Sequence, residues 1–321
     1  MEESETGKNQ ENTNTDSEEA SEADDNQDTN EMEIEVDPEA IEVHMNHHRI
    51  KDLKYFGDTL QCVEVLELRN NFITEIKNLD NLVTLKELEL YDNQITKLEN
   101  LDALVNLEVL DISFNRLRKI ENLDSLTKLK KLFLVNNKIT KIENINHLSN
   151  LEMLELGSNK IRVIENLEGL DNLKSLFLGK NKITKLQNLG SLVQLELISI
   201  QSNRIVKLEG LENLINLEQL YLSHNGIECM EGLENNKKLQ TLDMAANRIS
   251  RIENIEHLTD LEEFWFNDNQ IHKWEDVEVL KNFKKLNTVY LENNPIADDP
   301  MYRFKIKQIA SHIQQIDATM C

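Results

Sequence analysis

The sequence predicts an α/β solenoid, a stack of similar coils in which each coil adds one short strand to a curved parallel sheet. Two observations predict this fold. Asparagine recurs every 22 residues over most of the chain, and each of these asparagines stands in the same frame of leucines and isoleucines. A fixed period of roughly 20 to 50 residues is typical of repeat folds, because one repeat cannot bury its apolar face without its neighbours.

The recurring asparagines mark the successive coils. They are Asn71, Asn93, Asn115, Asn137, Asn159, Asn181, Asn203, Asn225, Asn247 and Asn269, with Asn294 after a longer step of 25 residues. Around Asn93, for example, Leu88 and Leu90 come before it and Ile95 and Leu98 come after it. This is the leucine-rich-repeat pattern L-x-x-L-x-L-x-x-N-x-I, in its 22-residue class.

Each part of this frame predicts a local structure. Side chains alternate along a strand, so the two leucines of L-x-L point into the core and the residue between them points outward. After the asparagine, apolar residues fall at every third position, which is the period of 3₁₀ or tight turns. We therefore expect a curved parallel sheet on the concave face and short 3₁₀ or helical segments on the convex face.

The asparagines themselves are predicted to be structural. Each lies where the chain turns inward, and its amide can both donate to and accept from backbone groups that a buried turn would leave unpaired. A buried unsatisfied backbone group costs about 1–3 kcal/mol. The repeated asparagine is thus explained without any functional role.

The two ends of the chain depart from the repeat. Residues 1–38 hold almost nothing to bury and are predicted to be a disordered acidic tail. Residues 39–65 are predicted to be an N-terminal cap and a degenerate repeat, with His48 in the asparagine position, and residues 66–294 to be the leucine-rich repeats. Residues 295–321 are predicted to form a C-terminal cap. The residues expected to cover the last apolar edge from a helix in that cap are Tyr302, Phe304, Ile306, Ile309, Ile313 and Ile316.

The last step, between Asn269 and Asn294, contains one extra triplet in its apolar row. Inserting three residues into a period of three keeps the inward face in phase. Trp274 occupies an inward position of this row, so it is predicted to be a core residue.

The composition excludes several classes of function. The chain has 59 acidic and 35 basic residues and a formal charge of −24, and its first 40 residues hold 16 acids and a single lysine. This negative balance repels phosphate backbones and anionic membranes. The sequence shows no signal peptide or long apolar segment, and its three cysteines form no CxxC pair. We expect a soluble intracellular protein that binds neither nucleic acid nor membrane.

No constellation of catalytic residues is recognisable. The sequence lacks GxGxxG, phosphate-loop, HExxH and GxSxG motifs and has only nine glycines. His44, His47 and His48 form the one cluster with metal-like spacing, and a polar cap segment explains them better than a metal site. We therefore expect no enzyme, no cofactor and no metal, and a function in surface recognition.

The concave face offers the candidate binding residues. The residue between the two leucines of each strand forms a central row: Glu67, Glu89, Asp111, Phe133, Glu155, Phe177, Ser199, Tyr221, Asp243, Trp265 and Tyr290. Five acids and five aromatics in this row fit a protein partner with a basic surface, since exposed aromatics concentrate binding energy and charges set register. Stacking of the aromatics on neighbouring strands is the alternative. The flanking row, two residues earlier in each strand, holds a single cation.

Several units resemble a known family of regulators. The segments ELYDNQITKLENL, LDISFNRLRKIENLD and LEEFWFNDNQ, with YLENNP and QIDAT near the C-terminus, are similar to the regulatory subunit 7 family of protein phosphatase 1. The resemblance covers residue 46 to the end. It implies a non-catalytic, leucine-rich-repeat regulator whose concave face binds the catalytic subunit of the type 1 serine/threonine phosphatase, together with an inhibitor subunit. It further implies residence in the nucleus and cytoplasm and a role in chromosome segregation.

The resemblance also implies contact residues. They are Asp111, Phe133, Glu155, Phe177, Asp243, Glu263, Trp265 and Tyr290. Seven of them lie in the central row, and Glu263 lies in the flanking row. The alternatives are a scaffold of a spliceosomal ribonucleoprotein and a cytoskeletal repeat adaptor. On its own the chain is expected to be a monomer.

Overall fold

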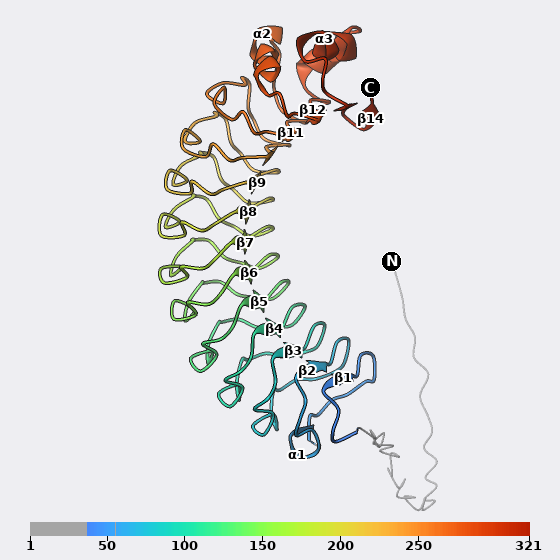
Figure 1. The fold of residues 1–321 in the computed structure, drawn as a ribbon, viewed down its shortest axis with the longest axis vertical. Helices are drawn as coiled ribbons and strands as arrows, with labels where there is room; N and C mark the ends of the chain where they lie inside the picture. The colour runs from blue at the N-terminus through green and yellow to red at the C-terminus, as the bar shows by residue number, and fades with distance from the viewer. Residues whose placement is uncertain (1–36, 55) are drawn as a thin grey trace, which may run out of the picture. The chain divides into compact units, whose positions relative to one another are not determined.

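The computed structural model describes residues 37–54 and 56–321. The predicted acidic tail, residues 1–38, thus lies almost entirely outside the described residues. The described part forms one sheet of 14 strands, whose spatial order follows the sequence from β1 to β14. The strands stack in one row along a curved column of coils, and the larger connecting loops lie on its outer side (Figure 1).

Each coil contributes one very short strand. The strands are β1 (Glu42–His44), β2 (Val65–Glu67), β3 (Glu87–Glu89), β4 (Val109–Asp111), β5 (Lys131–Phe133), β6 (Met153–Glu155), β7 (Ser175–Phe177), β8 (Leu197–Ser199), β9 (Gln219–Tyr221), β10 (Thr241–Asp243), β11 (Glu263–Trp265), β12 (Thr288–Tyr290), β13 (Gln315–Ile316) and β14 (Thr319–Met320). Strands β1 to β13 pair in parallel, and only the last pair, β13 with β14, is antiparallel.

The register of the sheet stacks equivalent residues of successive coils. Leu66 pairs with Leu88, and Leu88 pairs with Leu110, so the buried leucines form one continuous row. These leucines are completely buried. The predicted leucine-rich-repeat solenoid with its parallel sheet is confirmed.

The convex segments are mostly single turns. In the coil after β2, the Leu82 N–H donates to the Leu79 carbonyl at 3.0 Å, and the Leu85 N–H donates to the Leu82 carbonyl at 3.1 Å. These bonds join residues three apart, the 3₁₀ spacing that the period of three predicts. Each bond closes a single turn, because the residues between these leucines form no further bond of this kind, so the segment is not a continuous 3₁₀ helix.

Helical segments occur near the two ends of the described residues. They are α1 (Phe56–Thr59), α2 (Trp274–Val277), the 3₁₀ helices η1 (Glu278–Asn282) and η2 (Pro295–Asp298), and α3 (Tyr302–Ile309). Helices α2 and η1 fall in the 25-residue step, so the extra triplet is accommodated by coiling the convex segment more tightly.

The asparagines form a hydrogen-bonded ladder. Asn159 Nδ2 donates to the Leu134 carbonyl of the preceding coil at 2.9 Å, and its Oδ1 accepts the Ile139 N–H of that coil at 3.0 Å. The other asparagines of the series repeat this arrangement, including Asn294 with the Ile271 N–H at 2.9 Å. At the C-terminal end, Asp317 lies outside the ladder register, directly after Ile316 of β13, and its Oδ1 accepts the Leu291 N–H at 2.9 Å. The predicted structural role is confirmed.

A second regularity was not predicted from the sequence. The residue before each ladder asparagine has a positive φ, and so does a residue seven positions after most of them. Asparagine supplies many of these left-handed residues, such as Asn100, whose Nδ2 donates to the Ile76 carbonyl at 2.6 Å. Gly210 occupies the equivalent position seven residues after Asn203, and a Cβ atom there would lie 2.9 Å from the Leu186 carbonyl oxygen. Glycine avoids this contact and tolerates the left-handed backbone.

Two expectations about the core were wrong. Phe304 is 60% exposed, because α3 turns Tyr302 and Ile306 toward the last coil and Phe304 away from it. The helix also ends at Ile309, so Ile313 and Ile316 are buried after it, Ile316 on β13, and not on a helix as expected. Trp274 is only partly buried: its Nε1 donates to Asp299 Oδ2 at 3.1 Å, and the Lys305 ammonium lies 4.8 Å from its ring centre. An indole needs a polar partner, so it sits at the junction with the cap rather than inside the coil.

Candidate protein-binding face

The sheet geometry places the central row on the concave face. In most strands the middle leucine is buried while the residues on either side of it are partly exposed, as in β4 and β6. Two members of the row are more enclosed than alternation predicts, since Glu89 is 6% exposed and Asp243 is 4% exposed. The other predicted contact residues, Asp111, Phe133, Glu155, Phe177, Glu263, Trp265 and Tyr290, are partly exposed.

Strands β4 to β7 bring four of the predicted residues together. Asp111 pairs in register with Phe133, Phe133 with Glu155, and Glu155 with Phe177. Acid and aromatic side chains therefore alternate at the strand spacing of about 4.8 Å. Such an arrangement offers apolar contact area and hydrogen-bond acceptors side by side.

Asp111 and Glu155, the acids in this middle part, form no ion pairs within the described residues. Burial raises the pKa of Asp111, although Ser113 opposes the shift by donating its backbone N–H to Oδ1 at 2.8 Å. Burial also raises the pKa of Glu155, and the charge of Asp111 adds to the effect. Both carboxylates are partly desolvated without an ion pair in the described ranges, and the charge of Arg69 lowers the pKa of Asp111 by less than burial raises it. A cationic partner gains most from acids in this condition.

Strands β10 to β12 form a second group. The rings of Trp265 and Tyr290 are register partners, with centres 5.7 Å apart and planes inclined by 54°. The Tyr290 hydroxyl accepts a hydrogen bond from Gln315 Nε2 at 2.7 Å. Trp265 Nε1, in contrast, is buried and has no acceptor in the described part of the chain. An orphaned donor costs about 1–3 kcal/mol, so this indole marks a place where an acceptor is missing.

Asp243 on β10 and Glu263 on β11 belong to this second group. Asp243 Oδ1 accepts the Ala245 N–H at 3.0 Å, and burial raises the pKa of its carboxyl group. Glu263 pairs in register with Thr241 and Thr288 in the flanking row. The structure thus gathers the predicted residues into two groups on one face, with Ser199 and Tyr221 between them.

The N-terminal end of the central row is different, because its acids are paired within the chain. Glu67 Oε2 accepts a hydrogen bond from Asn46 Nδ2 at 2.9 Å and lies 3.1 Å from His44 Nδ1. Burial alone would raise the pKa of Glu67, but the bonds from Asn46 and His44 outweigh burial and lower it. Glu89 forms an ion pair with Arg69.

The sequence analysis missed a third concave row, two residues after the central one. Alternation continues past the second leucine, so this row faces the same side. Its aromatic member is Tyr91, whose ring centre lies 4.8 Å from that of Phe114. Extending the L-x-L frame by one more residue would have revealed it.

Two family models of leucine-rich repeats match the chain. The model described as Leucine Rich repeats (2 copies) matches five overlapping segments between residues 63 and 191, and the model described as Leucine-rich repeat matches residues 212–319. The matched segments cover most of the coils that the structure shows. The chain belongs to the leucine-rich-repeat family.

Curated relatives of this leucine-rich-repeat protein give short local matches. Protein phosphatase 1 regulatory subunit 7 of Danio rerio is 59% identical over 40 residues, which is 12% of this chain and 12% of the relative. The protein of the same name from Homo sapiens is 57% identical over 40 residues, which is 12% of this chain and 11% of the relative. The matched segment thus spans only about one eighth of these relatives.

Solved structures share the repeat architecture over a longer stretch. An internalin of Listeria monocytogenes superposes with a TM-score of 0.70 at 26% identity and covers 88% of this chain and 87% of its own. A second internalin, at 32% identity and a TM-score of 0.53, covers 57% of this chain and 81% of its own. A leucine-rich-repeat protein of Leptospira interrogans, at 23% identity and a TM-score of 0.68, supports the fold alone.

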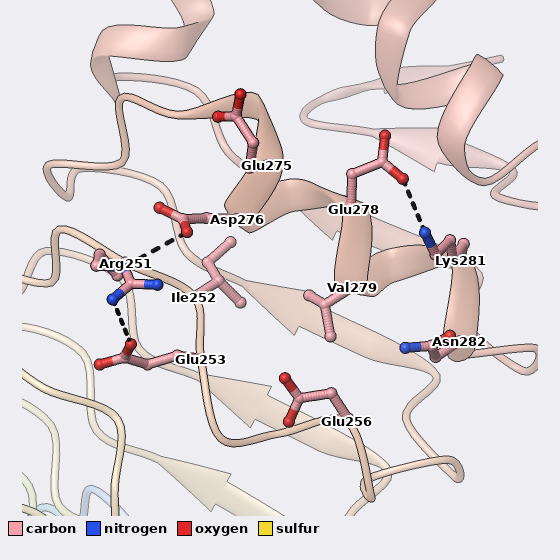
Figure 2. A pocket seen from close by; sticks show the side chains of 10 residues that line it. All are labelled: Arg251, Ile252, Glu253, Glu256, Glu275, Asp276, Glu278, Val279, Lys281 and Asn282. Carbon is pink, nitrogen blue, oxygen red and sulfur yellow. Dashed lines mark hydrogen bonds and ion pairs between the residues drawn. The ribbon is translucent and has the colours of Figure 1, made fainter.

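A recess of about 270 Å³ lies away from the concave rows, at the 25-residue step of this leucine-rich-repeat protein (Figure 2). Arg251 bridges Glu253 at 3.0 Å and Asp276 at 3.5 Å, while Lys281 pairs with Glu278 at 3.0 Å. Both cations of the recess are thus engaged, and none of the predicted contact residues lines it.

Residues 37–54 and 56–321 contain no group of three or more His, Cys, Asp or Glu arranged to hold a metal ion. The histidines of the N-terminal cluster have other partners, with His44 beside Glu67 at 3.1 Å and His48 Nδ1 bonded to the Asn46 carbonyl at 2.8 Å. Within these ranges no helix is long and apolar enough to cross a membrane.

Proposed function

We propose that the chain is a non-catalytic regulatory subunit that binds the catalytic subunit of the type 1 serine/threonine phosphatase through its concave face. The choice of partner rests on the curated relatives, because 57–59% identity over 40 residues relates this chain to phosphatase regulatory subunits. The proposed mode of binding rests on the side chains of the concave face.

The observation that supports binding best is the state of the concave side chains. Asp111 and Glu155 have raised pKa values and no ion pair in the described ranges, and Trp265 Nε1 has no acceptor there. Each of these groups would gain from a partner that supplies cations and a hydrogen-bond acceptor. Partly exposed Phe133, Phe177 and Tyr290 would supply the apolar contact area.

The proposal extends to the setting of the complex. A regulator of this class would work with an inhibitor subunit, in the nucleus and cytoplasm, and would act in chromosome segregation. These points rest on the family resemblance alone. Fluorescence microscopy of the tagged chain through the cell cycle tests the nuclear residence. Exclusion of the chain from the nucleus at every stage would contradict both that residence and a role in chromosome segregation.

The binding mechanism is tested by capture of purified phosphatase catalytic subunit on the immobilised chain. The double variant Phe177→Ala with Trp265→Ala should weaken capture by about a thousandfold, because central aromatic anchors each contribute on the order of 2 kcal/mol. Circular dichroism and the melting temperature establish that the variant is folded.

A matched control removes two aromatics elsewhere. Phe72 is 44% exposed and Phe304 is 60% exposed, and both lie outside the concave rows. The variant Phe72→Ala with Phe304→Ala should retain capture within about twofold. Equal capture by both folded double variants would show that the concave face is not the binding site, and no capture by the unaltered chain would refute the phosphatase partner.

A further inference from the structure

The edge of the solenoid where the strands end carries an unusual run of positive charge. In five consecutive coils, we consider the six residues that begin two positions before the ladder asparagine. Together these five segments contain eight lysines or arginines and no acid. The segments are 113–118, 135–140, 157–162, 179–184 and 201–206. In a chain with 59 acids, this absence of acid defines a distinct surface. It ends on both sides, with Asp92 in the coil before and Glu228 in the coil after.

The ladder fixes the position of these cations. The residue after each ladder asparagine donates its backbone N–H to the preceding coil, as Lys138 does to Leu117 at 2.7 Å and Lys160 does to Ile139 at 2.8 Å. One cation per coil therefore recurs at the coil spacing. We call this surface the basic edge. Its residues are Arg116, Arg118, Lys138, Lys160, Arg162, Lys180, Lys182 and Arg204.

The basic edge is unpaired, whereas the neighbouring basic row is not. Three positions further along three of these coils, Lys141 pairs with Glu143 at 3.9 Å, Lys185 with Glu209 at 3.6 Å and Lys207 with Glu231 at 3.3 Å. Within residues 37–54 and 56–321, no member of the basic edge forms an ion pair or a side-chain hydrogen bond. Most of its side chains are exposed. Within the described residues, the solenoid thus pairs three lysines of one row with its own glutamates and leaves the adjacent row without ion pairs.

The form of the edge indicates the form of its partner. Five coils at about 4.8 Å span about 20 Å, the length of about six extended residues. On one side of the edge, the row that contains the paired lysines is followed two residues later by Glu121, Glu143 and Glu165. On the other side, the central-row acids Asp111 and Glu155 come two residues before the segments of their coils. Positive potential is thus confined to a narrow strip. A broad polyanion such as duplex nucleic acid would meet these acids, whereas a single extended chain would not.

We propose that the basic edge is a docking site for an extended, Asp/Glu-rich segment of a partner protein. Carboxylates of the segment would pair with the free ammonium and guanidinium groups along the coil axis. The site is separate from the concave rows, so a partner could hold it while the concave face is occupied. This inference does not depend on the identity of the concave partner.

Fluorescence anisotropy of a labelled decaglutamate peptide with the full chain tests the proposal. The variant Lys138→Glu, Lys160→Glu, Lys182→Glu should weaken binding by about tenfold or more, since it replaces three attractive contacts with repulsive ones. Binding to the unaltered chain should also weaken as salt rises from about 50 mM to about 300 mM.

The control variant is Lys141→Glu, Lys185→Glu, Lys207→Glu, which changes the net charge by the same amount on the paired row. It should change binding by less than about threefold. Equal loss in both variants would show a general field effect and overturn the site, as would no loss in the first variant.

A ten-nucleotide oligothymidylate identifies the partner class. Tighter binding of this oligonucleotide than of decaglutamate, lost in the Lys138, Lys160, Lys182 variant, would overturn the assignment to an acidic protein. The variant Phe177→Ala with Trp265→Ala should bind decaglutamate normally. The outcome at this edge can therefore be separated from the outcome at the concave face.

Discussion

The two ends of the central row share a strand geometry but differ in how their acids are satisfied. Glu67 and Glu89, near the N-terminus, have partners in Asn46, His44 and Arg69. Asp111 and Glu155, two and four strands after Glu67, form no ion pair in the described ranges, although Asp111 accepts the Ser113 N–H, and burial raises the pKa of both acids. Position in the row therefore does not by itself make a contact residue.

The difference has an energetic consequence for binding. An acid that is already paired must exchange one cation for another, so a new partner gains little from it. An acid that the fold has partly desolvated without an ion pair has already lost part of its hydration in the free protein. The attraction of a partner's cation then adds to the binding free energy with little further desolvation cost. The three predictions below test this contrast between the ends of one row.

The largest contrast is expected between two single charge reversals in the central row. Glu155→Lys should weaken capture of the phosphatase catalytic subunit by about thirtyfold, because a free carboxylate becomes a repulsive ammonium. Glu67→Lys should weaken it by about threefold or less, since that acid is paired within the chain. Surface plasmon resonance measures both, and equal effects would remove the distinction.

A second contrast concerns folding stability. Arg69→Ala should lower the free energy of unfolding by about 1–3 kcal/mol, because it leaves Glu89, which is only 6% exposed, as an unpaired charge. Lys131→Ala, an exposed cation of the middle part without an ion pair in the described ranges, should change it by less than about 0.5 kcal/mol. Urea denaturation followed by circular dichroism compares the two, and a Lys131 effect as large as that of Arg69 would contradict the pairing argument.

The smallest expected effect is a pH dependence. Burial raises the pKa of Asp111 and Glu155, so these acids protonate at a higher pH than exposed carboxyls as the solution is acidified. Binding of a basic partner should therefore weaken by about threefold as the pH falls from about 7 toward the usual carboxyl range of about 4.

The same shift has the opposite sign for stability. An acid whose pKa is raised on folding contributes most to stability below its unfolded pKa, and this contribution is lost as the pH rises through the folded pKa. Asp111→Asn should therefore flatten the pH dependence of binding without destabilising the protein at neutral pH. A loss of melting temperature at neutral pH would show that the Asp111 charge is structural.

The sequence predicted the features that repeat and missed those that depend on single contacts between coils. A 22-residue asparagine frame determines strands, register and ladder, because each coil solves the same packing problem. The pairing of Arg69 with Glu89 and the burial of Asp243 depend on side-chain reach across neighbouring strands, which a one-dimensional pattern does not contain. Phe304 and Trp274 were misplaced for the same reason, since the cap departs from the repeat.

The asparagine ladder also determines how such a molecule can change in length. Every rung joins one coil to the next by the same bonds, so removal of a whole 22-residue unit would bring an identical donor and acceptor face to face. The scaffold is therefore indifferent to the number of coils. The binding face does depend on this number, because one strand, β6, lies between Phe133 and Phe177, and losing that coil would make them neighbours. Selection on the spacing of side chains, rather than on folding, would then hold the number of repeats constant.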